Sequence, residues 1–272
     1  MHEAEQMRIR WISDIHLNFL DHAGRRRFLG GLASRDADAW LLGGDIGEAD
    51  SVVEFLRMID AALPCKTYFT LGNHDFYGGS LTEVRARVRE LVSQSERLVW
   101  LTESDAQLFD GGVAIVGDDS WGDARFGNAL GTPVEQNDFF LIEELAGLSR
   151  PALVRTLNGL GDAAAARLSP KLERAAASRD QVVALMHVPP FREAAWHQGQ
   201  PSNDDWVPWF SCRAVGEVIL SCARAHPQVN FLVLCGHTHG SGVYSPLPNV
   251  TVHTAEAEYG APRIQRFFEV GA

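Results

Sequence analysis

The chain has 272 residues, of which 46% are apolar and 22% charged, and its formal net charge at pH 7 is −11. This composition is typical of a globular protein and excludes disorder as the main state. The acidic balance argues against nucleic acid as a partner, because such binding depends on clustered Lys and Arg. No apolar run approaches the ~18 residues of a membrane span, and the first residues lack the features of a secretory signal. We therefore expect a cytoplasmic protein without a membrane partner, whose oligomeric state the sequence leaves open.

Short β-rich runs alternate with amphipathic segments along the chain. Six runs of Val, Ile, Leu and aromatic residues predict strands at 7–13, 39–43, 67–71, 113–117, 181–186 and 231–235. Several of these runs are apolar almost throughout, which is typical of a sheet covered on both faces. The order of strands and helices predicts a layered α/β fold.

Helix starts are marked by capping boxes, in which a Ser or Thr precedes a Glu by three positions. Three such pairs occur: Ser51 with Glu54, Ser80 with Glu83, and Thr132 with Glu135. Pro133 suits the first position of the third helix. Beyond it, an Ala-rich stretch from Asp162 predicts two helices that Ser169 and Pro170 separate.

The C-terminal part, from residue 242 to 268, contains short strand-like runs with Pro and Asn turns. These runs predict an antiparallel finish to the sheet. The chain has no fixed-period repeat and no low-complexity linker. We expect a single domain over residues 1–272, with a helical and loop insertion around 118–180 that shapes the substrate pocket.

The four cysteines lie in apolar segments and lack the CxxC spacing of a zinc or redox site. They are Cys65, Cys212, Cys222 and Cys235. Buried, reduced thiols are the interpretation that this pattern favours.

Five short motifs stand at or just beyond the C-terminal ends of predicted strands. They are Asp14-Ile15-His16, Gly43-Gly44-Asp45, Gly72-Asn73-His74-Asp75, His187 and Gly236-His237-Thr238-His239. In open α/β sheets the carboxyl ends of the strands form the crevice in which ligands bind. Groups far apart in sequence are therefore expected to converge at one site.

The residue types in these motifs indicate a metal site. Asp, Asn and His supply oxygen and imidazole donors, which suit first-row metals such as Mn, Fe, Co or Zn better than Ca. Residues two apart on an extended segment point to the same side, so we expect Asp14 with His16, and His237 with His239, to aim both side chains at the crevice. Glycine before Asp45, Asn73 and His237 allows the backbone to turn sharply.

Together the five motifs resemble the motif set of the calcineurin-like metallophosphoesterases, over roughly residues 9–255. The resemblance implies a four-layer αββα sandwich with mixed sheets and two metal ions at the C-terminal ends of strands. It implies one metal held by Asp14, His16, Asp45 and His239, and a second held by Asp45, Asn73, His187 and His237. Mn or Fe is favoured, with Zn, Co and Ni as alternatives.

The activity that the resemblance implies is hydrolysis of a phosphate ester by in-line attack of metal-bound hydroxide on phosphorus. The expected substrate is a small phosphomonoester or phosphodiester, with nucleotide-like esters included. A nuclease of the same fold, a non-catalytic metal-binding scaffold and a redox metalloenzyme are the alternatives. The resemblance also makes His74 the group that contacts the phosphate or protonates the leaving oxygen, oriented by Asp75. A plain turn or helix-cap role for Asp75 stays open.

Loops beyond the motifs are expected to set specificity. Arg192 is the first candidate for a phosphate contact and Arg125 the second, although surface arginines are common. Four tryptophans lie in two of these loops: Trp121, Trp196, Trp206 and Trp209. They either cap the core or present faces on which a flat leaving group stacks. We expect residues 188–210, facing the Trp121 loop, to form the wall that selects the substrate.

Overall fold

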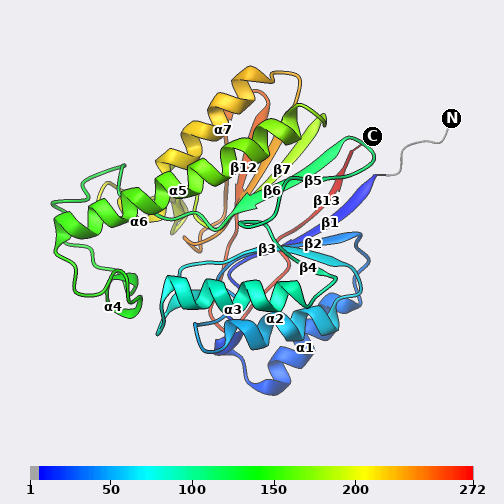
Figure 1. The fold of residues 1–272 in the computed structure, drawn as a ribbon, viewed down its shortest axis with the longest axis horizontal. Helices are drawn as coiled ribbons and strands as arrows, with labels where there is room; N and C mark the ends of the chain where they lie inside the picture. The colour runs from blue at the N-terminus through cyan, green and yellow to red at the C-terminus, as the bar shows by residue number, and fades with distance from the viewer. Residues whose placement is uncertain (1–5, 272) are drawn as a thin grey trace.

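The computed structural model describes residues 6–271 and contains two mixed β-sheets that face each other (Figure 1). The first sheet has the order β13 (Arg266–Val270), β1 (Met7–Ile12), β2 (Ala39–Gly43), β3 (Lys66–Thr70) and β4 (Leu98–Trp100). The second has the order β11 (Gly242–Leu247), β12 (Val250–Thr254), β10 (Asn230–Cys235), β7 (Gln181–Met186), β6 (Val113–Asp118) and β5 (Gln107–Leu108). The six strands expected from sequence are confirmed, with ends that shift by one residue.

Most strands within each sheet are parallel, so their C-terminal ends lie at the same edge of the sheet. Strands β1 to β4 are parallel, and so are β6, β7, β10 and β12. The edge strand β13 pairs antiparallel with β1, with Val270 opposite Met7, so the two ends of the chain share one sheet. The antiparallel finish is confirmed for β11 and β13, whereas β12 runs parallel to β10.

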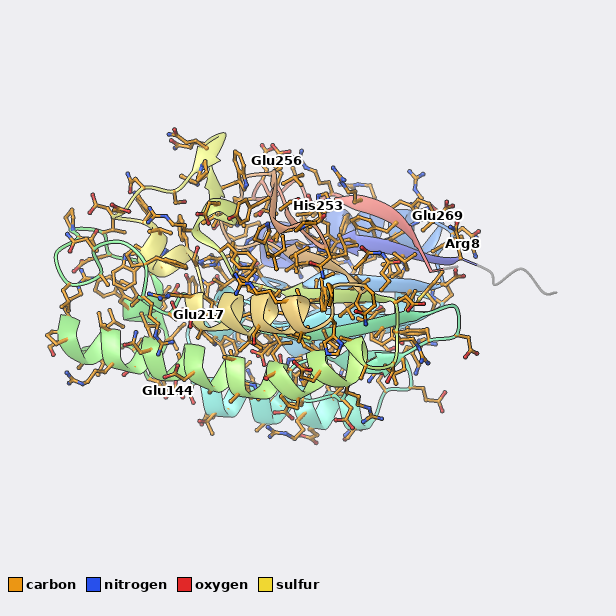
Figure 2. All side chains as sticks on the ribbon, turned by 90° about the horizontal axis from the view of Figure 1, so that it is seen from above. Arg8, Glu144, Glu217, His253, Glu256 and Glu269 are labelled. Atoms are coloured by element: carbon orange, nitrogen blue, oxygen red, sulfur yellow. The ribbon has the colours of Figure 1, made fainter. Side chains whose placement is uncertain are left out.

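Helices cover the outer face of each sheet and complete the four-layer αββα sandwich. Helices α1 (His22–Ala33), α2 (Val52–Ala62) and α3 (Leu81–Ser93) lie on the first sheet. Helices α5 (Arg150–Ala176) and α7 (Arg213–Ala225) lie side by side on the second (Figure 2). A third apolar cluster, including Trp11, Leu41, Tyr68 and Val183, fills the space between the sheets. The sheets are therefore buried on both faces, as the apolar strands predicted.

The capping boxes have different outcomes. Ser80 caps α3 by accepting hydrogen bonds from the amides of Thr82 and Glu83. Ser51 precedes α2, but its hydroxyl accepts from the amide of Glu48. The helix expected after Thr132 is wrong, because the Thr132 hydroxyl donates to the Asp205 carbonyl and the next helix, α4 (Asp138–Leu141), has only four residues.

The expected break at Pro170 is also wrong. Helix α5 runs through it for 27 residues. Leu168 and Leu172, on either side of the proline, are fully buried against the second sheet. Tertiary packing therefore outweighs the lost hydrogen bond and the steric cost of a proline inside a helix.

The remaining elements are short and lie in loops. They are the 3-10 helices η1 (Leu17–Phe19), η2 (His74–Phe76) and η3 (Arg192–Ala194), the pair β8 (Trp196–His197) and β9 (Gln200–Pro201), and α6 (Val207–Phe210). All four cysteines are free thiols; three are buried and Cys65 is half-buried. Within residues 6–271, every helix is too short or too polar to cross a membrane.

Candidate metal centre

The seven expected ligands come from loops that follow five strands in both sheets. Asp14 and His16 follow β1, Asp45 follows β2, and Asn73 follows β3. His187 follows β7, while His237 and His239 follow β10. Because these strands end at the same side of the sandwich, the loops meet there, and contacts described below bring all seven side chains together.

Left-handed backbone turns aim these side chains inward. Five ligand positions have positive φ angles: 53° at Asp14, 39° at His16, 50° at Asp45, 70° at His237 and 58° at His239. Non-glycine residues adopt this region rarely, and such strain persists where the surroundings enforce it. Here the amides of Asp14 and His16 donate to the carbonyls of Gly44 and Asp45, which joins the first two loops. Hydrogen bonds between the loops therefore hold the strained backbone in the conformation that forms the site.

Two glycines make room for the carboxylates. A Cβ on Gly72 would lie 2.1 Å from Oδ1 of Asp45, and a Cβ on Gly236 would lie 2.0 Å from Oδ2 of Asp14. Both distances are far inside van der Waals contact. Any side chain at either position would displace a candidate ligand.

One group of four donors forms a compact cluster. The donor atoms of Asp14, His16, Asp45 and His239 all lie within 4.8 Å of one another. Nε2 of His16 is 3.2 Å from Nε2 of His239 and 3.6 Å from Oδ2 of Asp45. Nε2 of His239 is 3.7 Å from Oδ1 of Asp14. Such spacing suits donors arranged around one ion.

A second group surrounds the other oxygen of Asp45. Oδ1 of Asp45 lies 3.4 Å from Nε2 of His187. Oδ1 of Asn73 lies 3.0 Å from the same nitrogen and 2.9 Å from Nδ1 of His237. Asp45 thus presents one oxygen to each group, which is the geometry of a carboxylate shared by two ions.

The neighbours of two histidines fix which nitrogen faces the centre. Nδ1 of His187 lies 2.8 Å from the Gly43 carbonyl, and Nε2 of His237 lies 3.2 Å from the Trp209 carbonyl. A carbonyl accepts only, so each of these nitrogens carries the proton. The opposite nitrogen then points an unprotonated lone pair at the centre, as a metal ligand requires.

The electrostatics fit bound cations. Burial, followed by the neighbouring histidines, lowers the pKa of His16 and His237, which keeps both imidazoles neutral. Burial, with a contribution from Asp14, raises the pKa of Asp45 to about 6. Converging lone pairs and buried carboxylates leave negative charge that divalent ions would compensate.

His74 and Asp75 occupy different places. The His74 ring lies beside that of His16, with centroids 4.7 Å apart, and burial lowers its pKa to about 4. The Asp75 carboxylate instead accepts backbone hydrogen bonds from Ile46, Gly47 and Gly72, each 2.8 Å long. These hydrogen bonds tie together the loops that carry Asp45 and Asn73, whereas the orienting role that the resemblance implies for Asp75 stays a prediction.

Comparison with known proteins identifies the family. A family model described as calcineurin-like phosphoesterase matches residues 7–241. The chain belongs to this family. It is a metal-dependent phosphoesterase, and the family implies two divalent metal ions. A search of curated proteins found no match.

Solved structures share the fold of this phosphoesterase. Phosphopantetheinyl hydrolase from Mycobacterium tuberculosis is 17% identical with a TM-score of 0.65, over 94% of this chain and 91% of that one. A dimetal phosphatase from Danio rerio is 14% identical with a TM-score of 0.56, over 92% of this chain and 87% of that one. At these identities the likeness concerns the fold.

An open cavity of about 360 Å³ lies beside the metal centre of the phosphoesterase. Its lining includes aromatic rings as well as carboxylates and amides. The lining comprises Asn73, His74, Tyr77, Glu135, Gln136, Asn137, Asp138, His197, Trp206, Phe210, His237, Thr238, His239 and Tyr259. The cavity is thus continuous with the ligands and open to solvent.

The two arginines expected to contact phosphate lie outside this lining. Arg125 pairs with Asp123 and Asp162, at 3.1 and 2.7 Å, and thereby fastens its loop to α5. Arg192 pairs with Asp204 at 2.7 Å on the surface. Both guanidinium groups already have carboxylate partners, so the structure does not place them at the reacting phosphate.

The four loop tryptophans divide between core and cavity. Trp121 and Trp209 are 3% and 2% exposed and pack on Phe76 and Phe139 respectively, so they belong to the core. Trp206 is 38% exposed and lines the cavity, where its ring stacks 6.2 Å from that of His197. Trp196 is half-buried outside the cavity lining. Of the residues expected in the 188–210 wall and the facing loop, Trp206, His197 and Phe210 line the cavity, whereas Trp196 and Trp121 do not. Selection of the substrate by this wall stays a prediction.

Sequence reasoning missed Asp138 and Tyr259. Asp138 contacts Asn73, which lies 65 positions earlier in the sequence. The Tyr259 ring lies 4.7 Å from His16 and 5.0 Å from His239. Neither residue belongs to a recognisable motif, and an Asn-Asp pair before two phenylalanines was the only local signal at 137–140.

Proposed function

We propose that this chain hydrolyses a small phosphomonoester or phosphodiester whose organic group is uncharged, at a two-metal centre in which Asp45 is the shared ligand. The observation that supports the assignment most directly is the position of Asp45. Its two oxygens face two separate groups of donors, at 3.6 Å from His16 and 3.4 Å from His187. The proposed sites are Asp14, His16, Asp45 and His239 for one ion, and Asp45, Asn73, His187 and His237 for the other.

Two bound divalent ions would polarise the phosphoryl oxygens and lower the pKa of a water nucleophile. The chain's own residues hold and surround the ester. His74 lines the cavity beside His16 and contacts the phosphoryl group or delivers a proton to the leaving oxygen. The buried loops hold the ligands at fixed positions, which provides the alignment that in-line displacement needs.

The cavity lining supports an uncharged organic group. Lys and Arg are absent from the residues that line it, whereas Glu135 and Asp138 are present. The phosphate charge would therefore be neutralised at the metal centre alone, and a second anionic group would meet carboxylates. This arrangement also disfavours nucleic acid, whose chain of phosphates needs a basic surface.

The aromatic side supports a flat or apolar moiety. Trp206 lies beside both His197 and Phe210, with ring centroids 6.2 and 5.4 Å away, and Tyr259 lies near the proposed metal ligands. Gln136 and Asn137 also line the cavity, and their amides can supply hydrogen bonds to a substrate. An aryl ester or an ester bearing amides matches this lining.

The test is a panel of phosphate esters with metal-loaded protein. The panel contains aryl and alkyl monoesters, their diesters, a cyclic nucleotide and a nucleoside triphosphate, each with Mn²⁺, Fe²⁺ or Zn²⁺. A phosphopantetheinyl ester is included because a structure with this fold is named as a hydrolase of that group. We expect the highest kcat/KM for an ester with one phosphate and an uncharged group. Faster turnover of the nucleoside triphosphate would contradict the proposal.

A further inference from the structure

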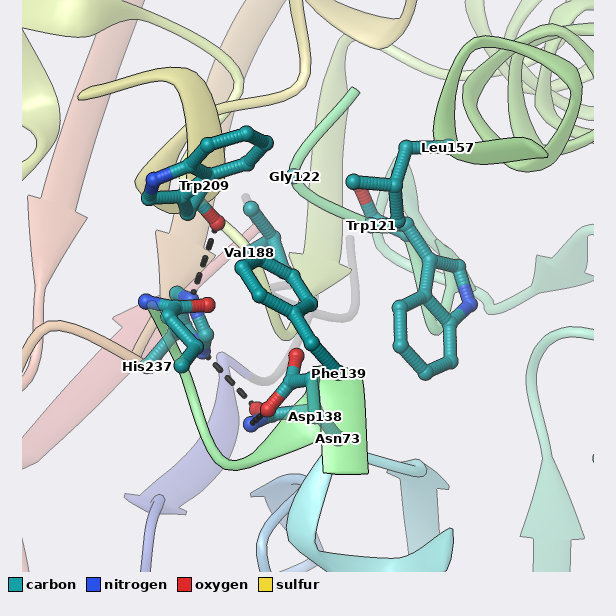
Figure 3. Close-up of a pocket in the computed structure, with 11 residues that line it drawn as sticks. Asn73, Trp121, Gly122, Asp138, Phe139, Leu157, Val188, Trp209 and His237 are labelled. Atoms are coloured by element: carbon teal, nitrogen blue, oxygen red, sulfur yellow. Dashed lines mark hydrogen bonds between the residues drawn. The ribbon is translucent and has the colours of Figure 1, made fainter. Parts of the chain in front are cut away.

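Asp138 holds the amide of Asn73 from a different part of the chain. Nδ2 of Asn73 donates to Oδ1 of Asp138 at 2.8 Å and contacts the Tyr77 hydroxyl at 3.0 Å. The Tyr77 hydroxyl donates to the same carboxylate oxygen. All three side chains are buried, with exposures of 6%, 6% and 7% for Asn73, Asp138 and Tyr77. Figure 3 shows Asp138 above Asn73, with His237 on the other side of the amide.

The chemistry of the partners decides which way this amide points. An ionised carboxylate only accepts hydrogen bonds, so it attracts the NH₂ end of the amide and repels its oxygen. With Nδ2 held at Asp138, Oδ1 of Asn73 is turned to His187 and His237, at 3.0 and 2.9 Å. A flipped amide would place its oxygen against the carboxylate and its NH₂ group among the metal donors.

The segment that carries Asp138 is itself fixed. The Gly78 amide donates to the Leu141 carbonyl at 2.8 Å, and the Glu143 amide donates to the Gly79 carbonyl at 3.0 Å. Phe139 packs edge-on against Trp209, with ring centroids 5.1 Å apart. Helix α4 is thus attached to the loop that follows Asn73, and Asp138 has a defined position relative to the amide.

We propose that Asp138, held in place by the Tyr77 hydroxyl, is a positioning residue. It orients Asn73 so that its amide oxygen faces the metal ion in the site of Asn73, His187 and His237. The inference rests on the proposed two-metal centre. A charged partner behind a ligand also polarises that ligand and increases its basicity. The segment between β6 and α5 therefore contributes to metal binding as well as to the cavity wall.

The test measures metal affinity in metal-stripped protein titrated with Mn²⁺, followed by calorimetry and electron paramagnetic resonance. Asp138→Ala should weaken one of the two sites about 10- to 100-fold, the usual effect of losing such a partner, and leave the other unchanged. Asp138→Asn keeps an acceptor oxygen that can face Nδ2, so its loss should be smaller. Tyr77→Phe removes only the hydroxyl, so its Mn²⁺ affinity should lie between those of wild type and Asp138→Ala.

Glu144→Ala is the matched control from the same segment. The Glu144 carboxylate accepts hydrogen bonds from Ser80, Leu81 and Thr82 at the start of α3 and touches none of the proposed ligands. We expect a lower melting temperature with both Mn²⁺ affinities retained. Equal weakening of metal binding in Glu144→Ala and Asp138→Ala would overturn the inference, since the effect would then be structural.

Two other outcomes separate this inference from the proposed function. If Asp138→Ala and Asp138→Asn bind two ions as tightly as wild type while KM rises, Asp138 is a substrate contact and the inference is wrong. If wild type itself binds fewer than two ions, the two-metal proposal fails instead.

Discussion

Asp45 is the residue on which both proposed metal sites depend. It is 1% exposed, and its two oxygens face different donor groups. Asp45→Asn keeps the shape but removes the charge and one anionic oxygen. We expect this variant to bind fewer than two ions per chain and to lose nearly all turnover, which elemental analysis and an ester assay would measure. A variant with two ions and near-normal activity would show that the ligand is not shared.

His74 lines the cavity, but we do not assign it to the metals. His74→Ala should therefore keep both ions and lose turnover by roughly 10² to 10⁴, the usual range for a positioned acid or base. If it supplies the proton, a nitrophenyl ester should lose less than an alkyl ester, because nitrophenolate leaves without one. Steady-state kinetics on both esters, with metal content as the control, would distinguish the roles. Equal losses would assign His74 to binding of the phosphoryl oxygens.

Two tryptophans at the short helix α6 have different surroundings because they pack differently. Trp206 precedes α6 and lines the cavity, whereas Trp209 within α6 is buried against Phe139. We expect Trp206→Ala to raise KM for aryl esters by one to two decades, in line with ~1 to 3 kcal/mol for stacking, while an alkyl phosphate changes little.

Trp209→Ala is the matched control for that prediction. It removes a buried aromatic side chain, which costs about 3–5 kcal/mol of stability. Its melting temperature should fall much further than that of Trp206→Ala. If Trp206→Ala instead lost stability and kept its preference for aryl esters, the aromatic wall would not select the substrate.

The regular elements were predictable where local signals agree with packing. Six apolar strands and the Ser80 cap appear where the sequence places them, because strand burial and capping are properties of a few neighbouring residues. The helix expected at Thr132 does not form, since the Thr132 hydroxyl bonds to Asp205 far along the chain. Likewise, Pro170 does not end α5, because Leu168 and Leu172 on either side of it are buried against the second sheet.

The candidate centre was predictable for a related reason. Its seven proposed ligands occur in short motifs at strand ends, and parallel strands bring such ends together. Asp138 and Trp206 carry no comparable signal: their positions depend on how the segments 119–149 and 188–210 fold over the strand ends. Arg125 and Arg192 were expected to contact phosphate, but they pair with Asp123, Asp162 and Asp204. These partners could not be identified from the sequence, because the pairing depends on how the loops fold.

At the scale of the whole molecule, the centre connects the two sheets. Asp14, Asp45 and Asn73 follow strands of the first sheet, whereas His187 and His237 follow strands of the second. Their contacts cross between the sheets, as where the His237 amide donates to Oδ1 of Asp14 at 2.8 Å and His187 donates to the Gly43 carbonyl. Ions held here would therefore contribute to the stability of the sandwich as well as to the reaction.

Metal removal tests that connection. Ions that bind only the folded chain stabilise it by about 4 kcal/mol each at a thousandfold excess over Kd. Chelation should therefore lower the melting temperature of wild type, and Mn²⁺ should restore it. In Asp45→Asn the difference between stripped and loaded protein should shrink, because metal binding is impaired. The stripped variant should also melt no lower than stripped wild type, since burial already disfavours the Asp45 charge and Asp14 repels it. Equal melting temperatures for stripped and loaded wild type would mean that the ions do not hold the two sheets together.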